Sequence, residues 1–131
     1  MNNQEVLNKF GQTLMREVRD RSIRELDRVM TGATPQTRAE MTARLSSLNP
    51  EQISAVQDFM VMAVDRVLFC TLDMLEQHET YGSPLPEWMD GTEMKLLVCG
   101  EDVVQLSDGL AGELFGDGWI QKFSQQPEPE R

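Results

Sequence analysis

The chain has 131 residues, of which 40% are hydrophobic, and its formal net charge at pH 7 is −10. This length and composition predict one globular domain with its own hydrophobic core, and they exclude an intrinsically disordered chain. The acidic balance argues against a nucleic-acid-binding protein, which needs a basic surface.

Acidic residues are concentrated in the C-terminal half. Up to residue 66 the basic and acidic residues are equal in number, so the whole acidic excess lies in residues 67–131. Such an asymmetry is compatible with an acidic surface that attracts a basic protein partner. Acidity that serves only to keep the protein soluble explains the same asymmetry.

The sequence contains no signal for export or for membrane insertion. Its first ten residues, MNNQEVLNKF, lack the basic and apolar regions of a signal peptide, and the apolar run over 59–64 is too short to span a bilayer. Cys70 and Cys99 each lie in an apolar run, which favours buried free thiols in a reducing compartment and leaves a disulfide between them open. We therefore expect a cytoplasmic protein with no membrane partner.

Helical spacing dominates the N-terminal residues. Apolar side chains recur at intervals of three or four residues at Leu7, Phe10, Leu14 and Val18. This spacing predicts a helix from about residue 3 to residue 30 that ends at Gly32. Beyond Val18 the apolar positions move round the helix, so we expect a bend or a new packing neighbour there.

Two further helices are each opened by a capping residue and a proline. Thr34 and Pro35 predict the start of a short second helix, and Asn49 and Pro50 predict the start of a third helix that runs from 50 to 78. The third helix carries two adjoining apolar stripes, which we expect to be buried. One consists of Ile53, Val56, Met60, Ala63 and Val67, and the other of Val61, Val64, Leu68, Leu72 and Leu75.

The opposite face of the third helix mixes acids with large apolar side chains. At 100° per residue it contains Asp58, Met62, Asp65, Phe69, Asp73 and Glu76. A face that is wholly solvated does not need Met62 and Phe69. Either loops or the C-terminal segment cover these two side chains, or they form the surface of a homodimer or of a complex with another protein.

The remaining residues predict a small β-hairpin and a closing segment. Residues 81–93 hold two prolines and two glycines and are typical of a linker. The runs Met94–Cys99 and Val103–Leu106 predict two short strands joined by Gly100, Glu101 and Asp102. The closing segment, 107–124, is rich in glycine, and Asp-Gly pairs predict turns in it.

The predicted fold is therefore mainly α, with a three-helix body that has one long central core helix and a small C-terminal β-hairpin with a glycine-rich closing segment. We expect a single globular domain over 1–124. It divides into a helical body (1–80), a linker (81–93), and the hairpin with the closing segment (94–124). Residues 125–131 are expected to be a disordered tail.

Motifs for catalysis, metals and cofactors are missing from the sequence. The single histidine, His78, lies near the expected end of a helix, and no zinc-binding spacing or phosphate-binding glycine loop occurs. We therefore assign no catalytic residue, no metal and no cofactor.

The candidate functional residues belong to two groups. The apolar interface candidates are Met62, Phe69, Trp88, Phe115 and Trp119, and the acidic surface candidates are Asp58, Asp65, Asp73, Asp108, Glu113 and Asp117. For Phe115 and Trp119, burial against the helices is the alternative reading, because tryptophan is common both in cores and in interfaces.

Three functions are compatible with these observations. The first is a non-enzymatic protein–protein interaction module, for example an immunity- or inhibitor-type protein that binds a basic partner. The second is a small enzyme or ligand binder whose pocket, lined by carboxylates, lies between the helical body and the closing segment. The third is a structural homodimer subunit.

Overall fold

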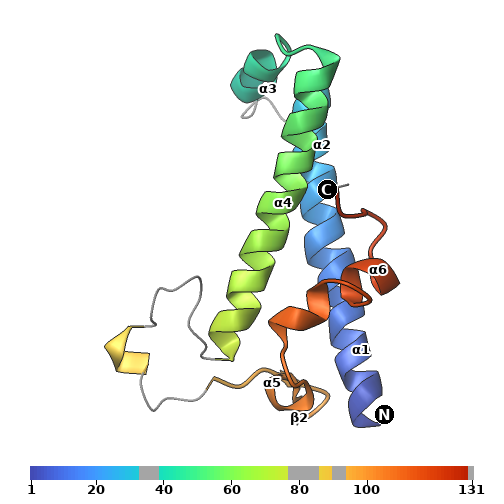
Figure 1. Ribbon diagram of the computed structural model, residues 1–131, viewed down its shortest axis with the longest axis vertical. Helices are drawn as coiled ribbons and strands as arrows, with labels where there is room; N and C mark the ends of the chain where they lie inside the picture. The colour runs from blue at the N-terminus through green and yellow to red at the C-terminus, as the bar shows by residue number, and fades with distance from the viewer. Residues whose placement is uncertain (33–38, 77–85, 90–93, 130–131) are drawn as a thin grey trace.

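A continuous helical rod runs from Asn3 to Thr31 in the computed structural model (Figure 1). The structure describes residues 1–32, 39–76, 86–89 and 94–129. The rod consists of α1 (Asn3–Thr13), the π-helix η1 (Leu14–Asp20) and α2 (Arg21–Thr31). The expected change of apolar face after Val18 thus falls within a π-helical stretch, whose wider turns shift the positions of the side chains. The rod ends at Gly32 as predicted, because the φ of 84° there is left-handed and favours glycine.

The long helix α4 (Pro50–Leu75) returns along the rod in the opposite direction (Figure 1). Its start is as predicted: the Asn49 side chain accepts a hydrogen bond from the Gln52 amide at 2.9 Å, and the Gln52 side chain accepts one from the Asn49 amide at 3.0 Å. This reciprocal capping box defines the first turn. The helix ends three residues before the expected position 78.

The short helix α3 (Ala39–Leu45) lies beside α2 at one end of the molecule, which we call the tip. It has no buried residue. The expected cap of this helix, Thr34, and Pro35 lie outside the described residues, as does most of the linker 81–93. Within that linker, the described turn η3 (Glu87–Met89) is a single turn of 3₁₀-helix.

The predicted hairpin is present but shorter than expected. Strands β1 (Leu97–Val98) and β2 (Glu101–Asp102) pair antiparallel, with Leu97 opposite Asp102 and Val98 opposite Glu101. The expected three-residue loop is wrong: the turn consists of Cys99 and Gly100, which have positive φ values of 51° and 78°. Positive φ at both central residues is the pattern of a type I′ turn, whose twist matches that of the strands.

The expected second strand over Val103–Leu106 is also wrong, because these residues form the short helix α5. Asp102 explains the change. Its Oδ1 accepts hydrogen bonds from the amides of Val104 at 3.2 Å and Leu96 at 3.1 Å. The same carboxylate therefore caps α5 and holds the chain that enters β1, and N-capping by aspartate overrides the β propensity of the two valines.

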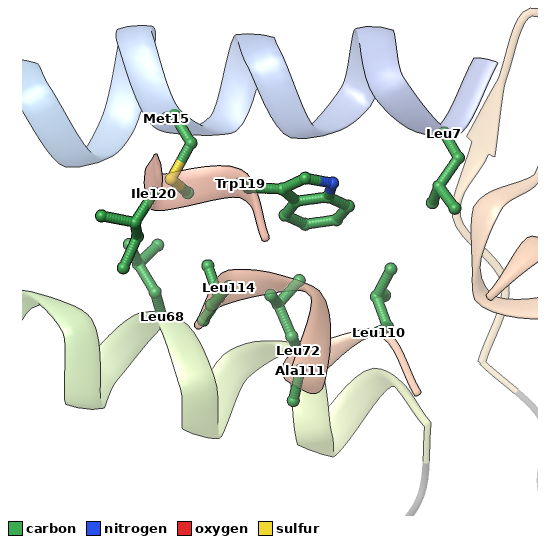
Figure 2. Packing of buried hydrophobic residues seen from close by; sticks show 9 residues of the cluster. All are labelled: Leu7, Met15, Leu68, Leu72, Leu110, Ala111, Leu114, Trp119 and Ile120. Atoms are coloured by element: carbon green, nitrogen blue, oxygen red, sulfur yellow. The ribbon is translucent and has the colours of Figure 1, made fainter. Parts of the chain in front are cut away.

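The hydrophobic core lies at the other end of the molecule, which we call the base. The closing segment supplies η4 (Ala111–Leu114) and α6 (Trp119–Phe123), which fill the space between α1 and the end of α4 (Figure 2). The cluster consists of Leu7, Met15, Leu68, Leu72, Leu110, Ala111, Leu114, Trp119 and Ile120. Trp119 is its largest member and lies against Gly11 and at 5.7 Å, edge to face, from the ring of Phe10. The closing segment thus completes the fold.

Gly11→Ala should lower the free energy of unfolding by about 1–3 kcal/mol. A Cβ at this position would lie 2.4 Å from the Trp119 ring, which is too close for any real contact. Helix propensity alone would favour alanine by about 1 kcal/mol, so a net loss reports the clash. Urea denaturation of the wild type and the variant measures it. The control is Gly112→Ala, where a Cβ meets nothing within 4 Å and the change should stay within about 0.5 kcal/mol. Equal effects of the two substitutions would contradict this account.

Candidate functional site

An apolar groove runs between α2 and α4 on the surface of the molecule. Its volume is about 430 Å³, and its lining is apolar except for one serine hydroxyl. The lining residues are Val18, Ser22 and Leu26 from the rod, and Phe59, Met60, Ala63, Val64, Val67 and Leu68 from α4. Phe59 is 69% exposed and Val67 is 66% exposed. These two side chains stand out into solvent beside the groove.

The groove exists because the apolar arc of α4 is wider than the fold can bury. On a helix with about 3.6 residues per turn, Leu72 lies roughly opposite Ala63. Leu68 and Leu72 are buried against the closing segment, whereas Ala63 and Val67 are exposed. The expected burial of the stripe through Ala63 and Val67 is therefore wrong. A pair of helices buries only the faces that meet each other or a further layer, and among the described residues only the short α3 adds to the pair near the tip.

A second hollow continues the groove toward the tip. It has a volume of about 750 Å³, lies between α2 and α3, and shares Ser22 and Leu26 with the groove. Its other lining residues are Glu25, Val29, Glu40, Met41 and Arg44. At the tip, one end of the otherwise apolar groove therefore has acidic side chains, Glu25 and Glu40, and a basic one, Arg44.

The apolar candidates from the sequence do not form one surface. Trp119 is only 1% exposed, so the core reading is right and this side chain is not available to a partner. Phe69 and Phe115 are half-buried and contact each other, with ring centroids 6.0 Å apart. Their contact supports the alternative in which the closing segment covers Phe69. Met62 remains 58% exposed and Trp88 remains 71% exposed.

For one of the acidic surface candidates, Asp65, the predicted exposure is wrong. Asp65 is in the interior, because its carboxylate binds the guanidinium of Arg19, with Nε to Oδ1 at 2.6 Å and Nη2 to Oδ2 at 3.2 Å. Its position among other acids on the helical wheel predicted that Asp65 is exposed. Pairing with a charged side chain from another helix allows the carboxylate to be buried instead. Asp58 is exposed and Asp73 is half-buried.

The carboxylates of the closing segment do not converge. Asp108 and Asp117 are exposed, and the half-buried Glu113 accepts a hydrogen bond from the Ser107 hydroxyl at 2.9 Å. None of the three lines either hollow between the helices. A pocket between the helical body and the closing segment that uses them as acid and base has no support here, so we do not propose it.

Arg19 is the centre of a buried polar network that sequence reasoning missed. Besides Asp65, its guanidinium donates to Ser124 Oγ at 2.7 Å and to the Gln126 carbonyl. The neighbouring Asp20 accepts from the Ser124 hydroxyl, and from the Gln125 amide at 2.9 Å. Gln125 and Gln126, the first residues of the tail that was expected to be disordered, are therefore held by hydrogen bonds to η1. Each charged group in the network has protein partners, which indicates a structural role for it.

Other kinds of site find no support among the described residues. No three His, Cys, Asp or Glu side chains there are arranged to hold a metal ion, and His78 lies outside the described ranges. Within the same part of the chain, no helix combines the length and the apolar character needed to cross a membrane. The two thiols are free as expected, but their expected burial is wrong, because Cys70 is only half-buried and Cys99 is exposed on the turn of the hairpin. The apolar groove is thus the feature with the clearest functional meaning.

Comparison with known proteins finds no match among family models, curated proteins or solved structures.

Proposed function

We propose that the protein is a non-enzymatic protein–protein interaction module that holds a helix of its partner in the groove between α2 and α4. The proposal rests on the two large side chains Phe59 and Val67, which are 69% and 66% exposed beside an apolar hollow. Scattered exposed apolar residues are ordinary on a protein surface, but a contiguous patch around a groove is typical of an interaction site.

The shape of the groove indicates the class of partner. Its two walls are helices, so a third helix can pack between them with its apolar residues in the space left by Ser22 and Ala63. Such a partner needs apolar side chains at intervals of three or four residues. At the tip, Glu25, Glu40 and Arg44 are available to polar groups at the end of the bound helix.

A basic partner that binds the acidic half is a second proposal. The exposed carboxylates of Asp108 and Asp117 support it, and so does the acidic excess after residue 66. An inhibitor that masks a basic protein is the specific version of this idea. A cytoplasmic location also remains a proposal, which the free thiols Cys70 and Cys99 favour.

Photo-cross-linking in the native host distinguishes the two surfaces. A benzophenone side chain at position 67 should form covalent adducts with a protein, because Val67 lies beside the groove. The same probe at position 117 tests the acidic surface. Adducts from position 67 alone support the groove, and adducts from position 117 alone support the acidic surface instead. If neither position gives an adduct with any protein, both proposals are wrong.

A further inference from the structure

We infer that the groove of one chain is filled by α4 of a second copy, in the opposite direction, so that α2 and α4 of both copies form a four-helix dimer. This inference rests on the proposed function, and it identifies the helix that occupies the groove as α4 of the same protein. A twofold dimer requires a surface that is complementary to itself. The face described above contains both a ridge, made by Phe59 and Val67, and a groove, whose opposite wall is Val18 and Leu26.

The sequence of α4 supports a helical partner of the same kind. Apolar residues recur at alternating steps of three and four at Ile53, Val56, Met60, Ala63, Val67, Cys70 and Met74. None of these seven residues is buried within the chain. Alternating steps of three and four over about three heptads are typical of the seam along which two helices pack in a coiled coil or four-helix bundle. The described part of the chain covers this seam only in part, with Ala63, Val67 and Met74 left exposed, so a second helix can complete its burial.

The size of the face is sufficient for a specific dimer. Beside α4, η1 and α2 extend over about 27 Å, and two adjacent helices are about 20 Å wide. Such a face offers roughly 500 Å² on each copy, or about 1,000 Å² in total, which reaches the lower limit of a specific interface. The small side chain of Ala63 lies between Phe59 and Val67 and allows the two α4 helices to approach closely.

Charge determines the direction of the second copy. The acidic excess of the chain lies after residue 66, in the end of α4, the hairpin and the closing segment, which belong to the base, whereas α2 at the tip carries three arginines and two acids. A parallel dimer would bring two acidic bases together, and juxtaposed like charges are unfavourable. An antiparallel dimer places each base beside the tip of the other copy. With Ala63 on the twofold axis, Phe59 then faces Val67 of the second copy.

Sedimentation equilibrium tests the association. The wild-type protein should sediment at twice the chain mass of 14.9 kDa, and Val67→Glu should sediment at the mass of one chain. Leu97→Glu is the matched control, because Leu97 on β1 is 65% exposed, almost as much as Val67. This control should remain a dimer, and circular dichroism should show all three proteins folded. A wild-type protein that is monomeric at every concentration, or a Val67→Glu variant that stays dimeric, overturns the inference.

Engineered cysteines test the direction, in a background with Cys70→Ser and Cys99→Ser. Ala63→Cys should form a disulfide between copies, since residue 63 of one copy meets residue 63 of the other copy at the twofold axis. Val67→Cys alone should not, because antiparallel packing separates its two copies by about 12 Å along the helix, beyond the reach of a disulfide. A mixture of Phe59→Cys and Val67→Cys chains should cross-link. Efficient self-cross-linking of Val67→Cys would indicate a parallel dimer and contradict the arrangement.

The dimer and the interaction surface can be disproved separately. If the purified protein is monomeric but the photo-probe at position 67 captures a different protein, the groove is an interaction site with another occupant, and only the dimer is wrong. If the protein is monomeric and position 67 captures nothing, the proposed function fails as well.

Discussion

Arg19→Met should lower the free energy of unfolding by about 3–5 kcal/mol, because it leaves the buried carboxylate of Asp65 without its partner. Arg19 is completely buried, and Asp65 has only 8% of its side chain exposed. Methionine fills a similar volume, so the loss reports the missing charge and hydrogen bonds. The Gln126 carbonyl also loses its donor. We therefore expect faster hydrogen exchange at the amides of 124–126, in addition to the lower stability in urea.

Arg21→Met is the matched control for this prediction. Arg21 is two residues further along the same rod and forms an ion pair with Glu25 at 3.5 Å, with side chains 65% and 48% exposed. Exposed pairs of this kind contribute less than about 1 kcal/mol. If the two methionine variants are equally stable, the buried pair does not have the role that its geometry indicates.

Trp119→Ala should also cost about 3–5 kcal/mol, because it removes the largest side chain of the core and leaves a cavity between α1 and α4. The chain has two tryptophans, and Trp88→Ala supplies the control. Trp88 is 71% exposed on η3, so its removal should change the stability by no more than about 0.5 kcal/mol. Far-ultraviolet circular dichroism in urea measures both variants without relying on tryptophan fluorescence.

A double substitution relates Trp119 to Gly11. In the Trp119→Ala background the indole ring that crowds position 11 is absent, so Gly11→Ala should no longer destabilise the protein. The two effects should therefore be far from additive, as expected for residues in direct contact. Additive losses would show that the close approach of α1 to α6 is not the reason for glycine at position 11.

Local signals predicted the helices well. Asn49 and Pro50 begin α4 as expected, and Gly32 ends the rod. Caps and helix-ending glycines act through hydrogen bonds and φ preferences within a few residues, so the sequence contains the whole cause. The same kind of reasoning failed at Val103–Leu106, where β-branched residues predicted a strand and the cap from Asp102 produced a helix.

The candidate site was predicted only in part. The sequence pointed to an apolar surface on the third helix, but at Met62 and Phe69, and the closing segment covers Phe69 through Phe115. The exposed groove is centred on Ala63 and Val67, which were expected in the core. One signal in the sequence identifies this seam, namely the alternating steps of three and four that continue through Cys70 to Met74. An amphipathic pattern shows that a stripe is apolar, but it does not show which layer covers it.

By itself, the sequence determined the helix boundaries at Asn49 and Gly32, the mainly helical class and the acidic C-terminal half, because these depend on composition and on neighbours along the chain. Only the tertiary structure decided that Arg19 pairs with Asp65, 46 residues away, and holds the Gln126 carbonyl, 107 residues away. It also decided that the closing segment covers one apolar face of α4 and leaves the other open. Both outcomes depend on which surfaces meet in space, and the free energy of burial is insensitive to the distance between residues along the chain.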